Sequence, residues 1–146
     1  MQLRDYLNFF VDIKAVPQSR PRGTAKSGFL KFYKLSKDRK YEEYVAESAL
    51  SVMLEHGIHK PTNSPVDMYV EVWRLPPESW SIKKKNMAYA REILPTPKPD
   101  ASNYYKLVED ALNKVVYVDD SQVIRQSSAK YYAEEEKVIV DIKVYE

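Results

Sequence analysis

The side chains in this sequence that are best suited to do chemistry are carboxylates and one lysine in a single short stretch. Asp100 comes first, Lys106 and Glu109 follow three positions apart, and Asp119 and Asp120 come soon after. Mg²⁺ takes oxygen ligands, is commonly held by one or two carboxylates and usually keeps several waters. Carboxylates from this stretch would form a magnesium site if the fold brought them together, with the lysine beside the ion.

A helix over residues 100–113 would align part of this set. At 100° per residue, its apolar side chains gather on one side and a polar stripe runs along the opposite side. The stripe consists of Ser102, Lys106, Glu109 and Asn113. Asp120 lies just before the next expected strand. Folding of the chain can therefore bring Asp100, the polar stripe and Asp120 together.

Each of these residues also has an ordinary structural explanation. Aspartate is a preferred helix N-cap, so Asp100 can simply begin the helix. Lys106 and Glu109 can be a solvated pair three residues apart, and Asp119 with Asp120 can form a turn. The spacing alone leaves the metal site and these alternatives open.

The elements around this stretch predict one α+β domain over residues 1–146, with helices packed on a mixed sheet. Apolar alternation predicts strands, and spacings of three and four predict helices. The predicted strands are 7–16, 66–75, 122–132 and 137–145, and the predicted helices are 38–56, 79–91 and 100–113. The element order is β-α-β-α-α-β-β, and the acidic turn at 133–136 predicts that the last two strands form a hairpin.

Composition excludes several classes of protein. The chain has 146 residues, of which 44% are hydrophobic and 30% charged, as in a folded soluble domain. It has no cysteine and only two histidines, so disulfides, thiolate sites and a histidine-rich zinc site are excluded. No apolar run approaches the roughly 18–20 residues that cross a bilayer, and the first residues do not resemble a signal peptide. We expect a cytoplasmic protein.

Charge is distributed unevenly, although the net charge is only +2. Nine lysines and arginines lie between residues 14 and 40, partly in a loop rich in Pro, Gly and Arg over 18–28, and Lys83-Lys84-Lys85 follows downstream. Acid gathers at 109–120 and 134–136. A basic arm beside an acidic centre fits a protein that holds a polyanion and brings metal to it. On charge alone, a mixed solvated surface is the alternative.

The stretch from Lys98 to Val123 resembles the signature of the RusA family, endodeoxyribonucleases that resolve four-way (Holliday) DNA junctions and are often encoded by phages and prophages. That family shows Pro-Asp-x-Asp-Asn, a lysine three residues beyond the Asn, Asp-Ala-Leu, and then Asp-Asp-x-Gln-Val. The matching segments here are Pro99-Asp100, Asn103, Lys106, Asp110-Ala111-Leu112 and Asp119-Asp120-Ser121-Gln122-Val123. The Pro/Arg segment at 16–22 echoes the family's N-terminal loop.

The resemblance implies a RusA-like fold and a metal-dependent, structure-specific endonuclease that acts on four-way junctions as a homodimer with Mg²⁺ or Mn²⁺. Asp100 and Asp120 are similar to metal-binding catalytic aspartates, and Lys106 is similar to the essential lysine. Ser102 stands where the family has the second aspartate of Asp-x-Asp. Glu109, seven residues on and about 20° away around the helix, can supply the missing carboxylate as a further metal ligand and catalytic group.

The basic side chains would then contact DNA phosphates and make binding strongly salt-dependent. The candidates are Arg20, Arg22, Lys26, Lys83, Lys84 and Lys85. Phe29, Phe32 and Tyr33 could wedge at the branch point or pack in a core or dimer interface. Two alternative functions stay open: a non-catalytic protein of the same fold that binds branched DNA, and a protein–protein adaptor that uses a tyrosine-rich surface with 12 tyrosines.

Overall fold

The computed structural model describes residues 2–11, 22–26, 29–33, 36–98 and 100–146. A four-stranded mixed sheet lies at its centre, with strand order β1 (Leu3–Val11), β6 (Lys137–Tyr145), β4 (Val66–Arg74) and β5 (Val123–Tyr132). Strand β6 runs antiparallel to both β1 and β4, and β5 runs parallel to β4. The α+β class and the mixed sheet are as the sequence predicts.

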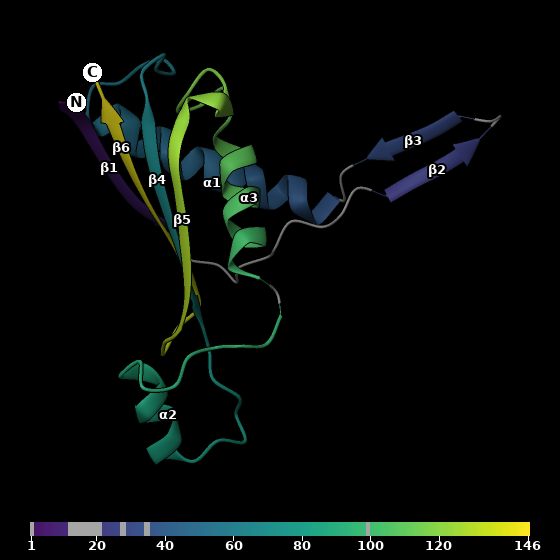
Figure 1. Ribbon diagram of the computed structural model, residues 1–146, viewed down its shortest axis with the longest axis vertical. Helices are drawn as coiled ribbons and strands as arrows, with labels where there is room; N and C mark the ends of the chain where they lie inside the picture. Colours follow the sequence, from purple (N-terminus) through teal and green to yellow (C-terminus); the bar gives the residue numbers. More distant parts are fainter. Residues whose placement is uncertain (1, 12–21, 27–28, 34–35, 99) are drawn as a thin grey trace.

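Two helices cover one face of this sheet, α1 (Ser36–Glu55) and α3 (Ala101–Leu112) (Figure 1). A third helix, α2 (Ile82–Tyr89), lies beyond one end of the sheet. Strands β2 (Arg22–Lys26) and β3 (Phe29–Tyr33) pair with each other in a separate two-stranded sheet. In the described part of the chain, no helix is both long and apolar enough to span a membrane.

The hydrophobic core forms where the helices meet the sheet. Every second residue of β4 and β6 is apolar and buried, as the alternation of a strand with one covered face requires. These residues are Val66, Met68, Val70, Val72, Val138, Val140, Ile142 and Val144. Each fully buried side chain of this kind contributes roughly 1.5–3 kcal/mol. This apolar layer holds α3, and therefore its polar residues, against the sheet.

The predicted hairpin of the last two strands is wrong. Strand β4 lies between β5 and β6, and the turn that joins them passes the end of β4, where the Ala133 N–H donates to the Arg74 carbonyl at 2.9 Å. Strand β6 buries alternate residues along its length and therefore takes an interior position. In strand β5 only Tyr132 is buried, and this strand lies at the edge of the sheet.

Two further differences concern the N-terminal region. The first strand begins at Leu3 rather than at residue 7, and residues 12–16 of the predicted strand lie outside the described residues. Residues 22–26, predicted as part of a loop, form strand β2, so the predicted element order lacks a hairpin before α1. The Ser27-Gly28 pair between β2 and β3 is a signal for such a hairpin.

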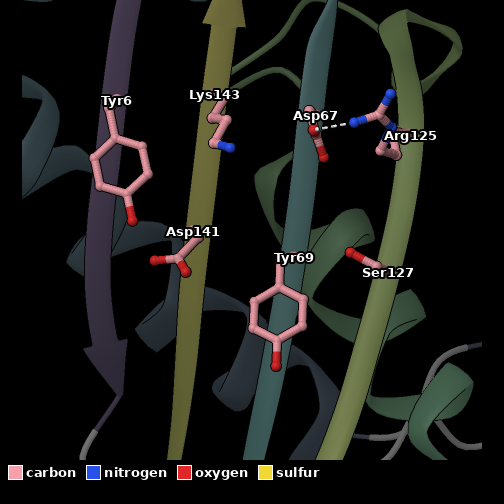
Figure 2. Close-up of a pocket in the computed structure, with 7 residues that line it drawn as sticks. All are labelled: Tyr6, Asp67, Tyr69, Arg125, Ser127, Asp141 and Lys143. Atoms are coloured by element: carbon pink, nitrogen blue, oxygen red, sulfur yellow. Dashed lines mark ion pairs between the residues drawn. The ribbon is translucent and has the colours of Figure 1, made fainter.

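The face of the sheet opposite α1 and α3 carries polar and aromatic side chains. A hollow of about 370 Å³ lies on this open face. Figure 2 shows the side chains that line it, which are Tyr6, Asp67, Tyr69, Arg125, Ser127, Asp141 and Lys143. Arg125 pairs with Asp67 at 3.5 Å. Charges of both signs alternate here, so this hollow lacks the single-sign field that favours a polyanion.

Candidate active site

Helix α3 carries the lysine and two of the carboxylates of the candidate site. Its extended N-cap residue is Asp100, and Leu107, Val108 and Leu112 are buried in the core. Glu109 is also on the buried side, with only 5% of its side chain exposed. Burial of a carboxylate costs free energy unless it is hydrogen-bonded or paired, so the partners of Glu109 indicate what the site can bind.

The chain turns back after α3 and brings Asp120 beside the helix. Lys114 has φ 66°, in the left-handed region that favours glycine, and its N–H donates to the Tyr117 carbonyl at 2.7 Å. Tyr117 is fully buried, and its hydroxyl donates to the backbone carbonyl of Glu109 at 2.6 Å. The turn is therefore tied to the helix at the position of Glu109.

Asp120 begins a short 3₁₀ helix, η1 (Asp120–Gln122), whose hydrogen bonds hold its backbone in position. Asp119 accepts from the Ser121 N–H at 3.0 Å, and the Gln122 side chain accepts from the Asp119 N–H at 2.9 Å, so the two form a capping box. The side-chain amide of Gln122 also donates to the carbonyls of Thr62 and Ser64, at 2.8 and 3.0 Å. These bonds anchor η1 to the loop before β4.

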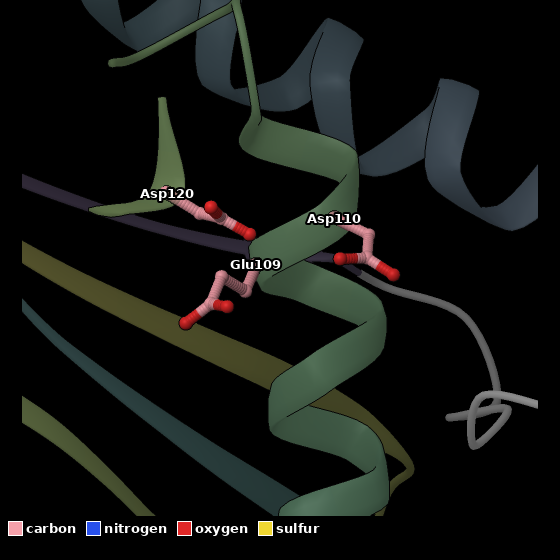
Figure 3. A group of neighbouring side chains, drawn as sticks. All are labelled: Glu109, Asp110 and Asp120. Carbon is pink, nitrogen blue, oxygen red and sulfur yellow. The ribbon is translucent and has the colours of Figure 1, made fainter. Parts of the chain in front are cut away.

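Three carboxylates meet at this place (Figure 3). One oxygen from each of Glu109, Asp110 and Asp120 lies within 4.8 Å of the others. The Lys106 Nζ lies among them, 3.3 Å from Glu109, 3.2 Å from Asp110 and 3.9 Å from Asp120. We call these four side chains the carboxylate centre.

The electrostatics of the carboxylate centre favour a bound cation. Partial burial by itself would lower the pKa of Lys106, but Asp110 and Glu109 outweigh it and raise that pKa above its ordinary value. Burial, and then the negative charge of Glu109, Asp120 and Asp110, raises the pKa of the Tyr117 hydroxyl. Tyr117 therefore stays a neutral hydrogen-bond donor.

The donor set fits a hard divalent ion. Carboxylate oxygens from three side chains, two of them only partly buried, leave room for waters in an octahedral shell, which Mg²⁺ prefers. Neither cysteine nor histidine takes part, so the set does not resemble a zinc site. Glu109, Asp110 and Asp120 are the described residues able to hold such an ion together.

Among the residues singled out in the sequence, the structure brings Lys106, Glu109 and Asp120 together and leaves Asp100 apart. Asp100 is exposed at the start of α3, nine positions before Glu109, or about 14 Å along the helix axis at roughly 1.5 Å per residue. Its side chain makes no capping hydrogen bond. Ser102 is likewise exposed in the first turn.

Asp110 is the member of the centre that sequence reasoning missed as a ligand. Its signal was present, since it lies four residues after Lys106 and begins the Asp-Ala-Leu motif. The alternative of a solvated Lys106–Glu109 pair does not describe the structure, because the pair exists but Glu109 is buried. Asp119 has the turn-forming role that its sequence also allowed.

The predicted DNA-contacting residues lie on separate elements. Lys83, Lys84 and Lys85 belong to α2, and the Lys84 Nζ lies 4.1 Å from the centre of the Trp80 ring. Arg22 and Lys26 are the two ends of strand β2. Arg20 lies outside the described residues. Figure 1 shows the β2–β3 hairpin and α2 at different ends of the molecule, with α3 between them.

Comparison with known proteins shows which family this chain resembles. The sequence profile of the family described as "Endodeoxyribonuclease RusA" matches residues 12–143, which include every residue of the carboxylate centre. The chain is also similar to an uncharacterized protein, YqaN, of Bacillus subtilis (strain 168). The two are 39% identical over 141 residues, which cover 95% of this chain and 96% of YqaN.

Proposed function

The chain belongs to the RusA endodeoxyribonuclease family, and from that premise we propose that it is a metal-dependent endonuclease that resolves four-way DNA junctions. The observation that carries the proposal is the carboxylate centre, in which Lys106 lies within 3.9 Å of all three carboxylates. A lysine among clustered carboxylates is suited to phosphodiester hydrolysis, because the reaction needs both a bound cation and a positive charge near the phosphate.

Glu109, Asp110 and Asp120 would hold Mg²⁺, with Mn²⁺ as the alternative ion. When bound, the ion would neutralise charge on the scissile phosphate and lower the pKa of a water. Lys106, whose side chain is about half exposed, can extend toward the phosphate and stabilise charge on the leaving oxygen. Asp100, which the sequence predicts as a ligand, lies apart from these three carboxylates at the start of α3, and its own variant tests whether it takes part.

Glu109 supplies a carboxylate where Ser102 supplies none, although it lies about two turns further along α3. It lies on the same side of α3 as Lys106 and beside Asp120, and it is held by hydrogen bonds at both its backbone and its side chain. The centre therefore has three carboxylates although the Asp-x-Asp motif has only one. This supports an active enzyme rather than a protein that only binds junctions.

The substrate is branched DNA, and the enzyme acts as a homodimer in the cytoplasm. A two-fold dimer has two centres, one for each of two opposing strands of a four-way junction. Contacts to DNA phosphates come from basic residues before and within β2 and from those of α2, namely Arg20, Arg22, Lys26 and Lys83–Lys85. The adaptor function is disfavoured, because at least five tyrosines in the described part of the chain are buried and so not on a surface, namely Tyr41, Tyr104, Tyr105, Tyr117 and Tyr132.

The test is a cleavage assay with a synthetic four-way junction and a linear duplex of the same sequence, with and without Mg²⁺ or Mn²⁺. We expect cuts in opposing strands of the junction only, and only with metal. Asp120→Asn should bind the junction at least as well as the wild type but not cut it, since the change removes a negative charge near the phosphate. A wild type that binds junctions without cutting would instead identify the non-catalytic DNA-binding protein.

A further inference from the structure

We propose that Gln126 is a positioning residue that fixes the Glu109 carboxylate for metal binding. Its side-chain amide donates to Glu109 Oε2 at 2.9 Å. The other oxygen, Oε1, faces Lys106 at 3.3 Å. The inference rests on the proposed function in one respect: it takes Glu109 as a ligand of the metal.

The sheet register places Gln126 on the correct face for this role. In the parallel ladder, Gln126 of β5 is the partner of Met68 of β4, which is fully buried under the helices. Side chains alternate along a strand, so the neighbouring Arg125 points to the other face, where it pairs with Asp67. A shift of one residue in β5 would remove the donor from Glu109.

A neutral amide is suited to hold a buried ligand carboxylate. The hydrogen bond gives the buried Glu109 carboxylate a donor, which offsets part of the free-energy cost of burying it. It adds no positive charge, so the carboxylate keeps its full attraction for a cation. Because the amide occupies Oε2, the carboxylate is held with Oε1 facing Lys106.

Tyr117 supports the same residue from the backbone side. Its hydroxyl holds the carbonyl of Glu109, while Gln126 holds the end of the side chain. The two contacts come from different segments, one leading into Asp120 and the other following it in β5. Glu109 and Asp120 are thus fixed relative to each other, and partners of this kind typically change metal affinity by about 10- to 100-fold when removed.

Titration calorimetry of the full chain without DNA, with Mg²⁺ and with Mn²⁺, tests the role directly. Gln126→Leu keeps the approximate volume and removes the donor, and we expect metal affinity to fall by about 10- to 100-fold. The matched control is Ser127→Ala, one residue along β5 on the open face, which should bind metal as the wild type does. Thermal melting and circular dichroism verify that each variant is folded.

A charge swap separates positioning of a ligand from simple packing. Glu109→Gln combined with Gln126→Glu preserves a hydrogen-bonded pair but moves the carboxylate from α3 to β5. We expect melting close to that of the wild type with metal affinity still lost. Recovery of metal affinity in the swap would overturn the inference.

The outcomes distinguish this inference from the proposed function. If the wild type binds metal and Gln126→Leu binds it equally well, Gln126 has no positioning role and the nuclease proposal stands. If the wild type binds neither ion, the metal centre and the role of Gln126 are overturned together.

Discussion

Two glutamates on opposite faces of the same sheet have opposite surroundings. Glu71, on the open face of β4, has 14% of its side chain exposed and accepts hydrogen bonds at both oxygens. The Tyr69 hydroxyl donates to Oε1 at 2.6 Å, and the Trp73 indole donates to Oε2 at 2.7 Å. Arg91 lies 3.4 Å from Oε2 and also stacks on Tyr131. Glu71 therefore connects the sheet to the segment that follows α2.

Glu109 has fewer donors and more negative neighbours. Within the carboxylate centre, three carboxylates share the single ammonium of Lys106, so negative charge is in excess among these four side chains. Burial alone does not distinguish the two glutamates. The difference teaches that a functional carboxylate is recognised by the other carboxylates beside it, since their repulsion is relieved only by a cation.

Matched substitutions at the two glutamates should have opposite results. Glu109→Gln removes a metal ligand, and we expect junction cleavage to fall about a thousandfold or more, as the loss of several kcal/mol of transition-state stabilisation implies. Glu71→Gln should leave cleavage within about twofold but lower the free energy of unfolding by roughly 1–3 kcal/mol, because its donors lose a charged acceptor. Single-turnover cleavage and urea denaturation measure the two effects. Equal losses of cleavage in both variants would remove the distinction.

Lys106→Met should separate catalysis from metal binding within the centre. Cleavage should fall by about 100- to 1,000-fold, the usual loss when one group that stabilises the transition state is removed. Metal affinity should instead rise, because the ammonium no longer competes for the three carboxylates. Calorimetry with Mn²⁺ and single-turnover cleavage together measure this opposite pair of changes. Weaker metal binding in the variant would contradict the arrangement proposed here.

The sequence was sufficient to identify most of the carboxylate centre but not its full composition. The helical period places Lys106 and Glu109 on one stripe, and the Asp-Asp pair points to Asp120. Asp110 lies beside that stripe on the helix. It becomes part of the centre because the chain returns through Tyr117 and η1 and places Asp120 close to it. Helix periodicity does not describe where a following loop lies, so the choice between Asp100 and Asp110 needed the fold.

The two ends of α3 can be compared in the same way. Asp110→Asn should reduce cleavage about tenfold or more, because it removes charge beside the metal, while Asp100→Asn should have an effect of no more than a few-fold if the ion is held by the carboxylate centre. The comparison uses cleavage rates at several Mg²⁺ concentrations. A larger loss for Asp100→Asn would return the first turn of α3 to the metal site, as the family motif predicts.

DNA contacts should differ between the N-terminal arm and the open face. Arg20→Ala with Arg22→Ala should lower the slope of log K against log salt by about one to two units, at roughly 0.9 per phosphate contact. Arg125→Ala with Lys143→Ala, which removes two cations from the hollow on the open face, should leave the slope unchanged. Junction binding measured by fluorescence anisotropy over a range of salt concentrations compares the two. A smaller slope for the open-face pair would place DNA on that side of the sheet.

Most elements of the fold were predictable, apart from the β2–β3 hairpin and the start of β1, but the pairing of the strands was not. The pattern of apolar residues predicts the bounds of β4, β5 and β6 to within one residue, because side chains alternate between the two faces of a strand. The same pattern does not predict which strands are neighbours in the sheet. The short turn at 133–136 suggested a hairpin, yet β4 lies between β5 and β6. Strands β4 and β6, each with four buried residues, occupy the two interior positions of the sheet.

The neighbour of β1 in the sheet also determines when the molecule can fold during its synthesis. Among the described strands, β1 pairs with β6 alone, so residues 3–11 wait for residues 137–145 to be made. At about 5–20 residues per second, that delay is on the order of ten seconds, and the backbone of β1 stays without its pairing strand throughout it. Pairings this distant in sequence also slow folding. A nascent chain that has already made every residue of the carboxylate centre therefore still lacks β6, one of the two interior strands of its sheet, and nuclease activity should begin only after β6 has been added.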